Sequence, residues 1–476
     1  MSSTTTPGAK GPKAPKGKQR RPDLDTVFTI NADGSRNFLH PADVHGRWQV
    51  RKNVIWTTLL LIYVLVPWIP INGHPAVHID IPGRNAFLFG ATFTNQDFYL
   101  MFFLVSGLGF SLFVLTSLWG RIWCGYACPQ TVFMEGVFRR IERWIEGPRD
   151  VRIRRNLGPV TGDKVWRKIV KHIVFLGLAW LNAHAFLAYF IPAHELLTAV
   201  TNPPQQHWAA FVWGTVWTLV LYGDYAWFRE QTCLIICPYG RAQSAMVDRD
   251  TVVIGYDERR GEPRSKKSSP DGGDCIDCFR CVAVCPTGID IRNGLQMECI
   301  GCANCVDACD EMMDRVGRPR GLVRYDSQRG FEGEPRASIF RPRVFLYAFL
   351  GLLGLSVATF TILKREPFEA RVLRSTGMPY VLEAESIRNI YDIRIQNKRD
   401  SSRSYTISLD PTGVPEDLEV VIAQPHVDVG GLADIRTPVV MTYPREDWNE
   451  AFPLTLRVTE DATGKHVDVD VKFRGP

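Results

Sequence analysis

The feature that most constrains this chain is a tandem cysteine pattern. Two runs share the spacing Cys-x2-Cys-x2-Cys-x3-Cys, the first over residues 275–285 and the second over residues 299–309. Bacterial ferredoxins with two [4Fe-4S] clusters have this spacing, and in them the fourth cysteine of each run ligates the other cluster. The pattern therefore predicts one cluster on Cys275, Cys278, Cys281 and Cys309, and a second on Cys299, Cys302, Cys305 and Cys285.

Structural zinc is the alternative for these cysteines, and it fits less well. Zinc sites take four ligands arranged as two pairs, whereas this chain has two four-cysteine runs in tandem. Pro286 follows Cys285 as in ferredoxins, but Asp310 follows Cys309. This departure leaves ligation intact, and we expect it to change solvent access to the sulfurs and with it the reduction potential.

Apolar segments indicate a membrane protein. Five stretches are long and apolar enough to cross a bilayer as helices, and only Asp224, near the end of the fourth, interrupts that segment. They run near Asn53–Ile71, Phe98–Gly120, Ile169–Ile191, Trp208–Phe228 and Val344–Leu363. Residues 1–45 are polar, so we expect the first span to act as a signal anchor and not as a cleavable signal peptide.

The distribution of Lys and Arg predicts the orientation. Segment 120–171 carries twelve of them, loop 72–97 carries one, and loop 192–207 carries none. Because basic loops stay on the cytoplasmic side, we expect the amino terminus, residues 120–168 and residues 229–342 to be cytoplasmic. The iron–sulfur thiolates then face a reducing compartment. The net charge of +6 belongs to these basic loops, so nucleic-acid binding is not expected.

An odd number of spans places the carboxy-terminal region in the periplasm. Its apolar residues alternate with polar ones in several short segments, which predicts a β-sandwich. The alternating sets are Tyr391, Ile393, Ile395; Tyr405, Ile407, Leu409; Leu454, Leu456, Val458; and Val467, Val469, Val471, Phe473. His426 and His466 lie in this region and are expected to be surface residues.

The expected organisation is thus a multi-domain membrane protein. A polar, disordered cytoplasmic tail (1–45) precedes a four-span membrane domain (46–247) and a ferredoxin-like α+β insert with two clusters (248–342). A fifth span (343–364) leads to an all-β domain (365–476).

The four remaining cysteines form a second motif. Cys124 and Cys128 precede Pro129, and Cys233 and Cys237 precede Pro238, each pair just after a span that exits to the cytoplasm. A spacing of four puts both thiols on one face of a helical turn. Equivalent depth lets the two pairs converge, and soft thiolates favour Cu(I), zinc or an iron–sulfur centre. Small buried hydrophobes are the alternative for such cysteines.

Other ionisable groups near the spans are weaker candidates. His184, with Asn182, lies inside the third apolar segment, where it serves either helix packing or a ligand or proton-relay role. Asp224 and Glu135 lie near the thiols, as proton carriers or as solvated residues at span ends.

These motifs together resemble the FixG/RdxA/CcoG family of cytochrome oxidase accessory proteins. The resemblance covers nearly the whole chain beyond the polar tail, and it implies an immunoglobulin-like carboxy-terminal sandwich. It also implies a bacterial inner-membrane protein that reduces Cu(II) to Cu(I) during assembly of a cbb-type oxidase. Its implied partners are oxidase assembly factors or a copper transporter or chaperone, and a cytoplasmic electron donor. Carried over by motif, Cys124, Cys128, Cys233 and Cys237 are the copper-handling thiols, with copper as substrate or bound ion.

Two other functions remain open. The paired Cys-x3-Cys-Pro motifs are shared with membrane subunits of quinol dehydrogenases, which would make the chain an electron-transfer subunit served by quinol. A non-enzymatic assembly scaffold or redox sensor, with structural clusters and a partner-binding sandwich, is the third possibility.

Overall fold

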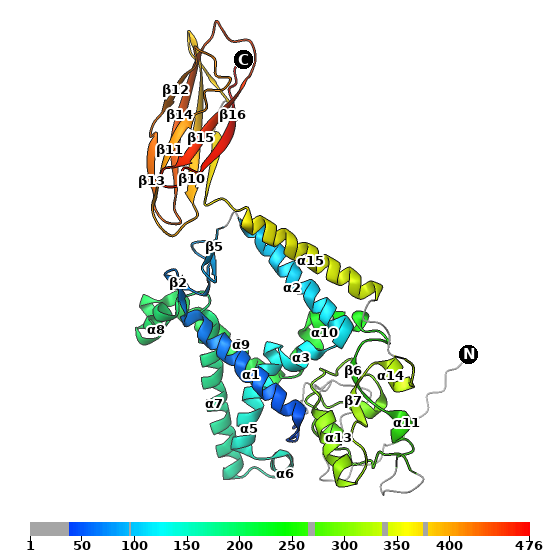
Figure 1. Cartoon of the computed structure of the whole chain (residues 1–476). Coiled ribbons are helices and arrows are strands. Elements are labelled where there is room, and N and C mark those ends of the chain that lie inside the picture. Colours follow the sequence, from blue (N-terminus) through cyan, green and yellow to red (C-terminus); the bar gives the residue numbers. More distant parts are fainter. Residues whose placement is uncertain (1–37, 95–96, 265–271, 336–340, 375–378) are drawn as a thin grey trace, which may run out of the picture. The chain divides into compact units, whose positions relative to one another are not determined.

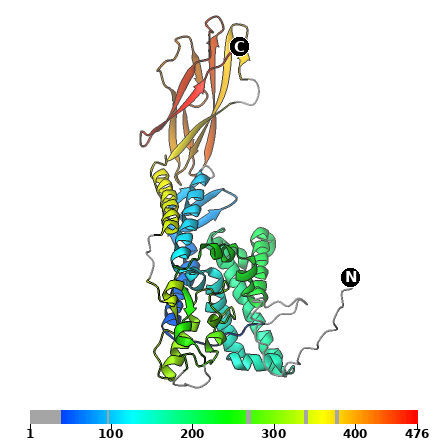
Figure 2. The ribbon, with the colours of Figure 1, turned by 90° about the vertical axis from the view of Figure 1, so that its right-hand side faces the viewer.

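The computed structural model describes residues 38–94, 97–264, 272–335, 341–374 and 379–476. The chain divides into two compact units (Figures 1 and 2). The first unit holds residues up to His78 and Leu104–Leu355, and the second holds Ile79–Phe103 and Ser356–Pro476. The predicted disorder of the tail concerns mainly residues 1–37, which lie outside the described residues.

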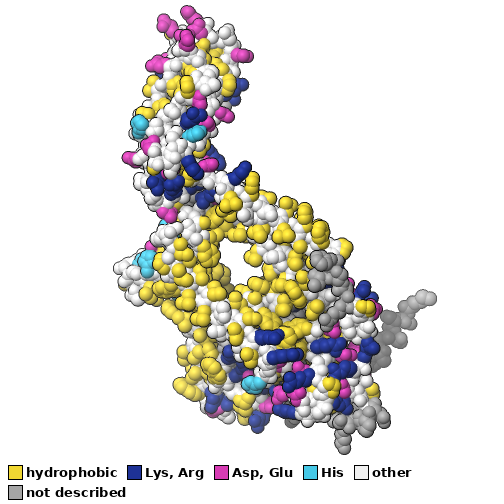
Figure 3. Space-filling model, in the orientation of Figure 1, with side chains coloured by type: hydrophobic (Ala, Val, Ile, Leu, Met, Phe, Trp, Pro, Cys, Tyr) yellow, Lys and Arg dark blue, Asp and Glu magenta, His cyan; other side chains and the backbone are white. Residues whose placement is uncertain are grey.

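Four helices within the described residues are long and apolar enough to cross a membrane. They are α1 (Arg47–Leu65), α2 (Phe98–Trp119), α7 (Gly162–Leu187) and α15 (Pro342–Leu363). The remaining predicted span forms α9 (Trp208–Gly223), a helix of 16 residues that continues as the π-helical turn η5 (Asp224–Phe228). Hydrophobic side chains cover much of the visible surface of these helices (Figure 3).

Helix α7 differs from its predicted bounds. It begins seven residues before the apolar segment, because Thr161 caps it by accepting a hydrogen bond from the Lys164 amide at 3.3 Å. It ends at Leu187, a few residues short of Pro192, which cannot continue a helix. The basic first turns of α7 are therefore helical and continuous with its apolar part.

Short helices and a hairpin connect the long ones. Between α2 and α7 they are α3 (Ile122–Tyr126), α4 (Pro129–Phe133), η3 (Met134–Phe138), α5 (Arg139–Glu146) and α6 (Arg149–Leu157). Further along the chain come α8 (Ala193–Thr201), η4 (Pro204–Gln206), η6 (Thr232–Ile236) and α10 (Pro238–Met246). Strands β1 (Pro70–Ile71) and β2 (His74–Pro75) pair as a hairpin that follows α1.

An aromatic cluster holds the π-helical turns η3 and η5 against α7. The ring of Phe138 stacks on Tyr225 with centroids 4.3 Å apart and meets Phe175 edge-on at 5.0 Å. All three side chains are buried. Such pairs add specific geometry to the burial of apolar area, so the segments that carry the cysteine pairs are fixed to the long helices.

The tandem cysteine runs lie in a small α+β region of the first unit. Its strands β6 (Val253–Tyr256) and β7 (Val323–Asp326) pair antiparallel. Between the two strands, the chain forms α11 (Glu258–Gly261), α12 (Arg280–Ala283), η7 (Ile291–Asn293) and α13 (Asn304–Arg315). Helix α14 (Gln328–Glu332) follows β7.

This region is docked on α1. The buried Asp307 carboxylate of α13 accepts hydrogen bonds from the backbone amides of Trp48 and Gln49, at 3.2 and 2.8 Å. A carboxylate at a helix amino terminus satisfies free N–H groups and favours the helix dipole. Residues 38–45 pack here as well, because Ala42 and Val44 are buried and the Ala42 amide bonds to the Ala283 carbonyl at 2.8 Å. The predicted disordered tail is therefore ordered over its last residues.

The second unit is a β-sandwich, as the alternation predicts. One sheet has the order β12-β14-β10-β8, with β9 on β10, and the other has the order β13-β11-β15-β16. The strands are β8 (Phe368–Arg374), β9 (Val381–Leu382), β10 (Ser386–Asn397), β11 (Arg403–Leu409), β12 (Glu419–Ile422), β13 (His426–Val429), β14 (Asp434–Pro444), β15 (Pro453–Glu460) and β16 (His466–Lys472). Ile393, Ile407 and Leu456 are buried between the sheets, and His426 and His466 are exposed as predicted.

A small sheet absent from the sequence-based prediction lies in the segment between α1 and α2. Strands β3 (Val77–Asp80), β4 (Asn85–Leu88) and β5 (Ala91–Phe93) form it within what was expected to be a plain loop. Asp97, which follows β5, pairs with Arg365 at 2.6 Å and with Lys398 at 3.5 Å.

Candidate iron–sulfur and thiol site

The fold gathers the first predicted set of cluster cysteines around one cavity. Cys275, Cys278, Cys281 and Cys309 all line it, together with Tyr256, Phe279 and Arg292. Cys309 comes from α13, so the fourth cysteine of the second run does reach the first three of the other run. The grouping is the one that the spacing predicts.

A second cavity collects the other four cysteines. Cys285, Cys299, Cys302 and Cys305 line it, and Cys281 of the first set touches it as well. All six pairs among these four are close enough for the charge of one thiolate to raise the pKa of another. Cys305 is also within this range of Cys281, so the two sets are neighbours.

The backbone explains how each run wraps its cavity. Phe279 and Ala303 occupy matching places in the two runs, and both have left-handed φ angles, of 55° and 60°. Each immediately precedes a helix, α12 in the first run and α13 in the second, that carries the next cysteine. The two runs therefore repeat one local fold, and the four-thiol lining of each cavity fits a [4Fe-4S] cluster.

Burial dominates the electrostatics of these thiols. It raises the pKa of Cys299 and Cys309 to about 12 and that of Cys302 to about 11. Arg121 and Lys52 act in the opposite direction on Cys299 and Cys302. Nearby cations of this kind favour the thiolate form that metal binding requires.

The two Cys-x3-Cys-Pro motifs have similar local structures, but not the one predicted. Cys124 lies in α3 and Cys233 in the π-helical turn η6, whereas Cys128 and Cys237 are extended residues that precede α4 and α10. Their ψ angles are 125° and 111°. The prediction of two thiols on one helical turn is therefore wrong, because a following proline disfavours the helical conformation of the residue before it.

The two motifs nevertheless converge, as predicted. All six pairs among Cys124, Cys128, Cys233 and Cys237 are close enough for one thiolate to raise the pKa of another. The Cys124 sulfur lies 3.6 Å from Nε2 and 3.7 Å from Oε1 of Gln243, a fully buried residue of α10. Arg121, just before α3, donates to the Gly240 carbonyl in the other motif. We call these four cysteines the thiol quartet.

The thiol quartet is not a ready-made site for one ion. Among the described residues, no group of three or more His, Cys, Asp or Glu side chains is arranged to hold a single metal ion. Burial raises the pKa of Cys124 to about 11 and also raises that of Cys128 and Cys233. At neutral pH these free thiols are protonated, so metal uptake must displace protons.

The thiol quartet lies directly against the second set of cluster cysteines. A Cβ atom on Gly125, between Cys124 and Cys128, would lie 2.8 Å from the Ile300 carbonyl oxygen and 2.9 Å from Cys302 Cα. In return, a Cβ on Gly301, whose φ is +69°, would lie 3.1 Å from the Arg121 carbonyl group. Two glycines thus allow the backbones of the two cysteine systems to touch.

A buried ion network joins the same two parts. Arg139 of α5 pairs with Glu135 and, at 2.8 Å, with Glu230, and it donates to the Pro286 carbonyl at 3.1 Å. Pro286 follows Cys285, and Glu230 lies three residues before Cys233. A small cavity between the systems is lined by Gln130, Glu135, Arg139, Glu230, Cys233, Pro286 and Ile300, among others.

The weaker candidates fall in different places. Asp224 accepts hydrogen bonds from Gln130, at 3.2 Å, and from the Thr232 hydroxyl, so it lies beside the thiol quartet as predicted. His184 is on α7, where Nδ1 lies 2.8 Å from the Trp180 carbonyl oxygen. These contacts suit helix packing, and a ligand role for His184 stays a prediction.

Sequence reasoning missed the buried residues that support the site. Gln243, Arg139 and Glu230 are nearly inaccessible to solvent. The sequence does contain a clue to two of them, because Gln243 and Glu230 lie within seven residues of a quartet cysteine. A buried polar side chain close to such a motif is normally hydrogen-bonded, and so can support the site. Gly125 and Gly301 interrupt the cysteine motifs and carry a comparable signal.

Comparison with known families defines the class of protein. Residues 228–328 match a family described as a 4Fe-4S dicluster domain, and residues 100–149 match a 4Fe-4S binding domain. Residues 358–476 match the "IG-like fold at C-terminal of FixG, putative oxidoreductase". Together with the four apolar helices, these matches define a membrane iron–sulfur protein with an immunoglobulin-like domain.

Whole-chain similarity then gives the family. The chain is 34% identical to nitrogen fixation protein FixG of Rhizobium meliloti, over 94% of this chain and 95% of that protein. It is 38% identical to protein RdxA of Cereibacter sphaeroides, over 79% of this chain and 82% of the relative. The chain belongs to the FixG/RdxA family. A solved FixG-related protein from Vibrio parahaemolyticus aligns at 14% identity over 23% of this chain and 96% of that chain, with a TM-score of 0.20.

Proposed function

We propose that this protein reduces Cu(II) to Cu(I) at the membrane, for assembly of a cbb-type cytochrome oxidase. The observation that carries the proposal is the contact between the thiol quartet and the second set of cluster cysteines, through Gly125 and Gly301. Electron tunnelling weakens steeply with distance, so a redox-active metal at the thiol quartet is served best by a donor whose ligands touch its own.

The eight ferredoxin cysteines are the proposed cluster ligands. Cys275, Cys278, Cys281 and Cys309 would hold one [4Fe-4S] cluster, and Cys285, Cys299, Cys302 and Cys305 the other. Such clusters, when bound, supply single electrons at low potential. Lys52 and Arg121 place positive charge beside the second set, and the Arg139–Pro286 hydrogen bond fixes the loop that carries Cys285.

The thiol quartet is the proposed copper site, with copper as substrate. Thiolates are soft ligands that hold Cu(I) better than Cu(II), so the quartet favours the reduced product. One Cu(II) ion takes up one electron to give one Cu(I) ion. Since the four thiols are not closed around a single ion, copper uptake draws Cys128 and Cys237, which lie outside their helices, toward Cys124 and Cys233.

The proposed topology follows the basic loops. The helix α9 is about 24 Å long, and with η5 it is long enough to serve as the fourth of five spans. The protein is then a multi-pass protein of the bacterial inner membrane, with the iron–sulfur region in the cytoplasm and the sandwich in the periplasm. A cytoplasmic reductant supplies the electrons, and Cu(I) passes to a copper transporter, a chaperone or an oxidase assembly factor.

The proposal is tested with protein purified without oxygen. Iron, sulfide and copper are measured, and the protein is reduced and mixed with Cu(II) in the presence of a Cu(I)-specific chelator. We expect eight iron atoms per chain and catalytic formation of Cu(I). Stoichiometric binding of Cu(I) without turnover would favour the scaffold or redox sensor instead, and cluster reduction by a quinol analogue would favour a quinol-dependent subunit.

A further inference from the structure

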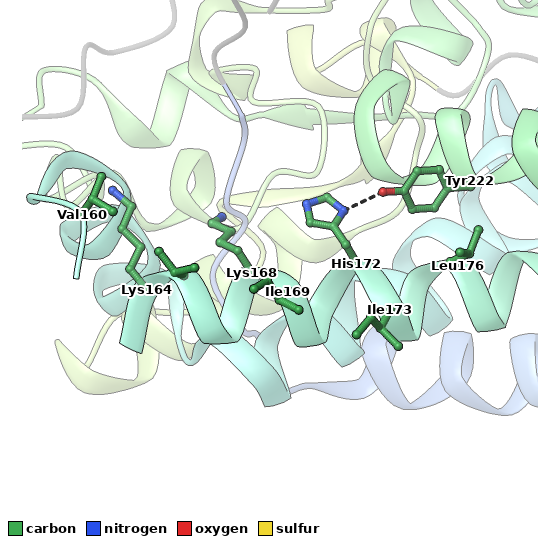
Figure 4. Close-up of a pocket in the computed structure, with 9 residues that line it drawn as sticks. Val160, Lys164, Lys168, Ile169, His172, Ile173, Leu176 and Tyr222 are labelled. Carbon is green, nitrogen blue, oxygen red and sulfur yellow. Dashed lines mark hydrogen bonds between the residues drawn. The ribbon is translucent and has the colours of Figure 1, made fainter. Parts of the chain in front are cut away.

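A groove on the surface of α7 combines basic and apolar side chains. Its volume is about 520 Å³, and it runs along the first half of the helix (Figure 4). Its lining includes Lys164, Lys168, Ile169, His172, Ile173 and Leu176 of α7, and Tyr222 of α9. Residues 164, 168 and 172 recur every four positions, so a row of basic side chains follows one face of the helix beside an apolar row.

The cationic end of this groove is backed by excess positive charge. Lys164 Nζ bonds only to carbonyl oxygens within the described residues, those of Asn156 and Gly158 at 3.2 and 3.0 Å. Lys168 pairs with the buried Glu146 at 3.0 Å, but that carboxylate is shared with Lys171. Across the connected network, two carboxylates serve four cations: Glu142 and Glu146 against Arg152, Lys168, Lys171 and Arg229. An anion is the complement of such a surplus.

The apolar row beside these basic side chains is open. Ile173 is 65% exposed and Ile169 is 47% exposed, on a helix apolar enough to cross a membrane. One turn past Lys168, the Tyr222 hydroxyl and His172 Nδ1 form a hydrogen bond of 2.9 Å (Figure 4). The groove therefore has two lysines and a polar pair along one row and apolar side chains along the neighbouring row, which continues to Leu176, about one turn past His172.

We propose that this groove is a binding site for one anionic phospholipid. Its phosphate lies between Lys164 and Lys168, and an acyl chain follows Ile169, Ile173 and Leu176 into the bilayer. Basic pockets beside membrane helices are suited to anionic headgroups, and lysine stems at a helix end reach the headgroup level. A quinone would use the His172–Tyr222 pair, but it has no charge to match the lysines.

The site is tested by native mass spectrometry of the full chain in detergent. Phosphatidylglycerol and phosphatidylcholine serve as separate probes, and Lys164→Gln/Lys168→Gln is compared with the wild type. Lys364→Gln, at the end of α15, is the matched control. We expect the wild type to retain one phosphatidylglycerol several-fold better than phosphatidylcholine, the double variant to lose this preference, and the control to keep it.

Iron–sulfur absorbance reports whether each variant is folded. Lys164→Gln alone leaves the Lys168–Glu146 pair intact. If the double variant is unstable, this single variant is measured in its place. Equal retention of both lipids, or unchanged phosphatidylglycerol binding in the variants, would overturn the proposal. So would a quinone that co-purifies with the wild type and is lost from the double variant.

Discussion

The two cysteine systems of this protein, the ferredoxin-like region and the thiol quartet, position their thiols by different backbone structures. In the ferredoxin-like region, short loops with left-handed residues at Phe279 and Ala303 wrap four thiols around each cavity. In the thiol quartet, two separate helix-to-helix junctions each contribute one helical and one extended cysteine. The first arrangement places four thiols around each of two cavities, whereas the second brings thiols together from two separate junctions.

This difference suggests a division of labour. Ligands wrapped around a cavity by short loops suit a cofactor that stays, and ligands divided between two junctions suit an ion that arrives, is reduced and departs. The clearest test of this difference is to remove ligands from one system and measure metal content and Cu(II) reduction in the other.

The largest effect is expected from the ferredoxin cysteines. Cys305→Ser removes one of the four proposed ligands of the second cluster, and the fifth cysteine at this cavity, Cys281, is a proposed ligand of the first. The second cluster should therefore be lost, along with all Cu(II) reduction. Absorbance near 400 nm, iron content and electron paramagnetic resonance of the reduced protein measure the loss. Eight iron atoms retained in this variant would contradict the ligand assignment.

The thiol quartet should give a separable phenotype. Cys124→Ala/Cys128→Ala is expected to keep its iron–sulfur absorbance and to lose Cu(II) reduction by an order of magnitude or more. Cys233→Ala/Cys237→Ala serves as the matched variant, and the equivalence of the two motifs predicts the same result. Full activity in either variant would remove these thiols from the mechanism.

Copper binding at the thiol quartet should depend on pH. Burial raises the pKa of Cys124 to about 11, so this thiol is protonated at pH 7 and must lose its proton to ligate copper. For each proton that copper binding releases, the Cu(I) affinity rises by about tenfold per pH unit. The Cu(I) affinity therefore falls as the pH is lowered. Competition with a Cu(I) chelator between pH 6 and pH 8 measures this slope, and a flat profile would show that buried thiols are not the ligands.

A smaller effect is expected where the two systems touch. Gly125→Ala forces the Ile300–Cys302 backbone away, because the new Cβ would lie within 3.0 Å of three of its atoms. Cu(II) reduction should slow several-fold while iron content and Cu(I) affinity persist. Altered magnetic coupling or relaxation of the second cluster gives a second readout. Gly177→Ala on α7 is the control, since nothing lies within 4 Å of its added Cβ.

The sequence predicted the elements that have strong local patterns. Cysteine spacing gave both sets of four, and period-two alternation gave the inward residues of the sandwich, such as Ile393 and Leu456. The long apolar helices follow equally directly from composition. Each of these signals lies within a short stretch of chain and needs no tertiary information.

The missing parts depend on contacts between distant segments. One error was local: Pro129 and Pro238 hold the preceding cysteine in an extended conformation, whereas the cysteine spacing alone suggested two thiols on one helical turn. The role of Gly125 becomes visible only when Ile300 is next to it, and the burial of Arg139 only when Glu230 and Pro286 surround it. The groove on α7 likewise requires Tyr222 from α9.

The most direct test of the account is a single turnover. Protein with both clusters reduced is mixed anaerobically with Cu(II), and cluster oxidation and Cu(I) formation are followed together by stopped-flow absorbance. We predict one Cu(I) ion formed per cluster electron lost in the wild type, and reduced clusters that persist when Cys124, Cys128, Cys233 and Cys237 are all replaced by serine. Oxidation of the clusters by Cu(II) at the same rate without these four thiols would contradict the central claim.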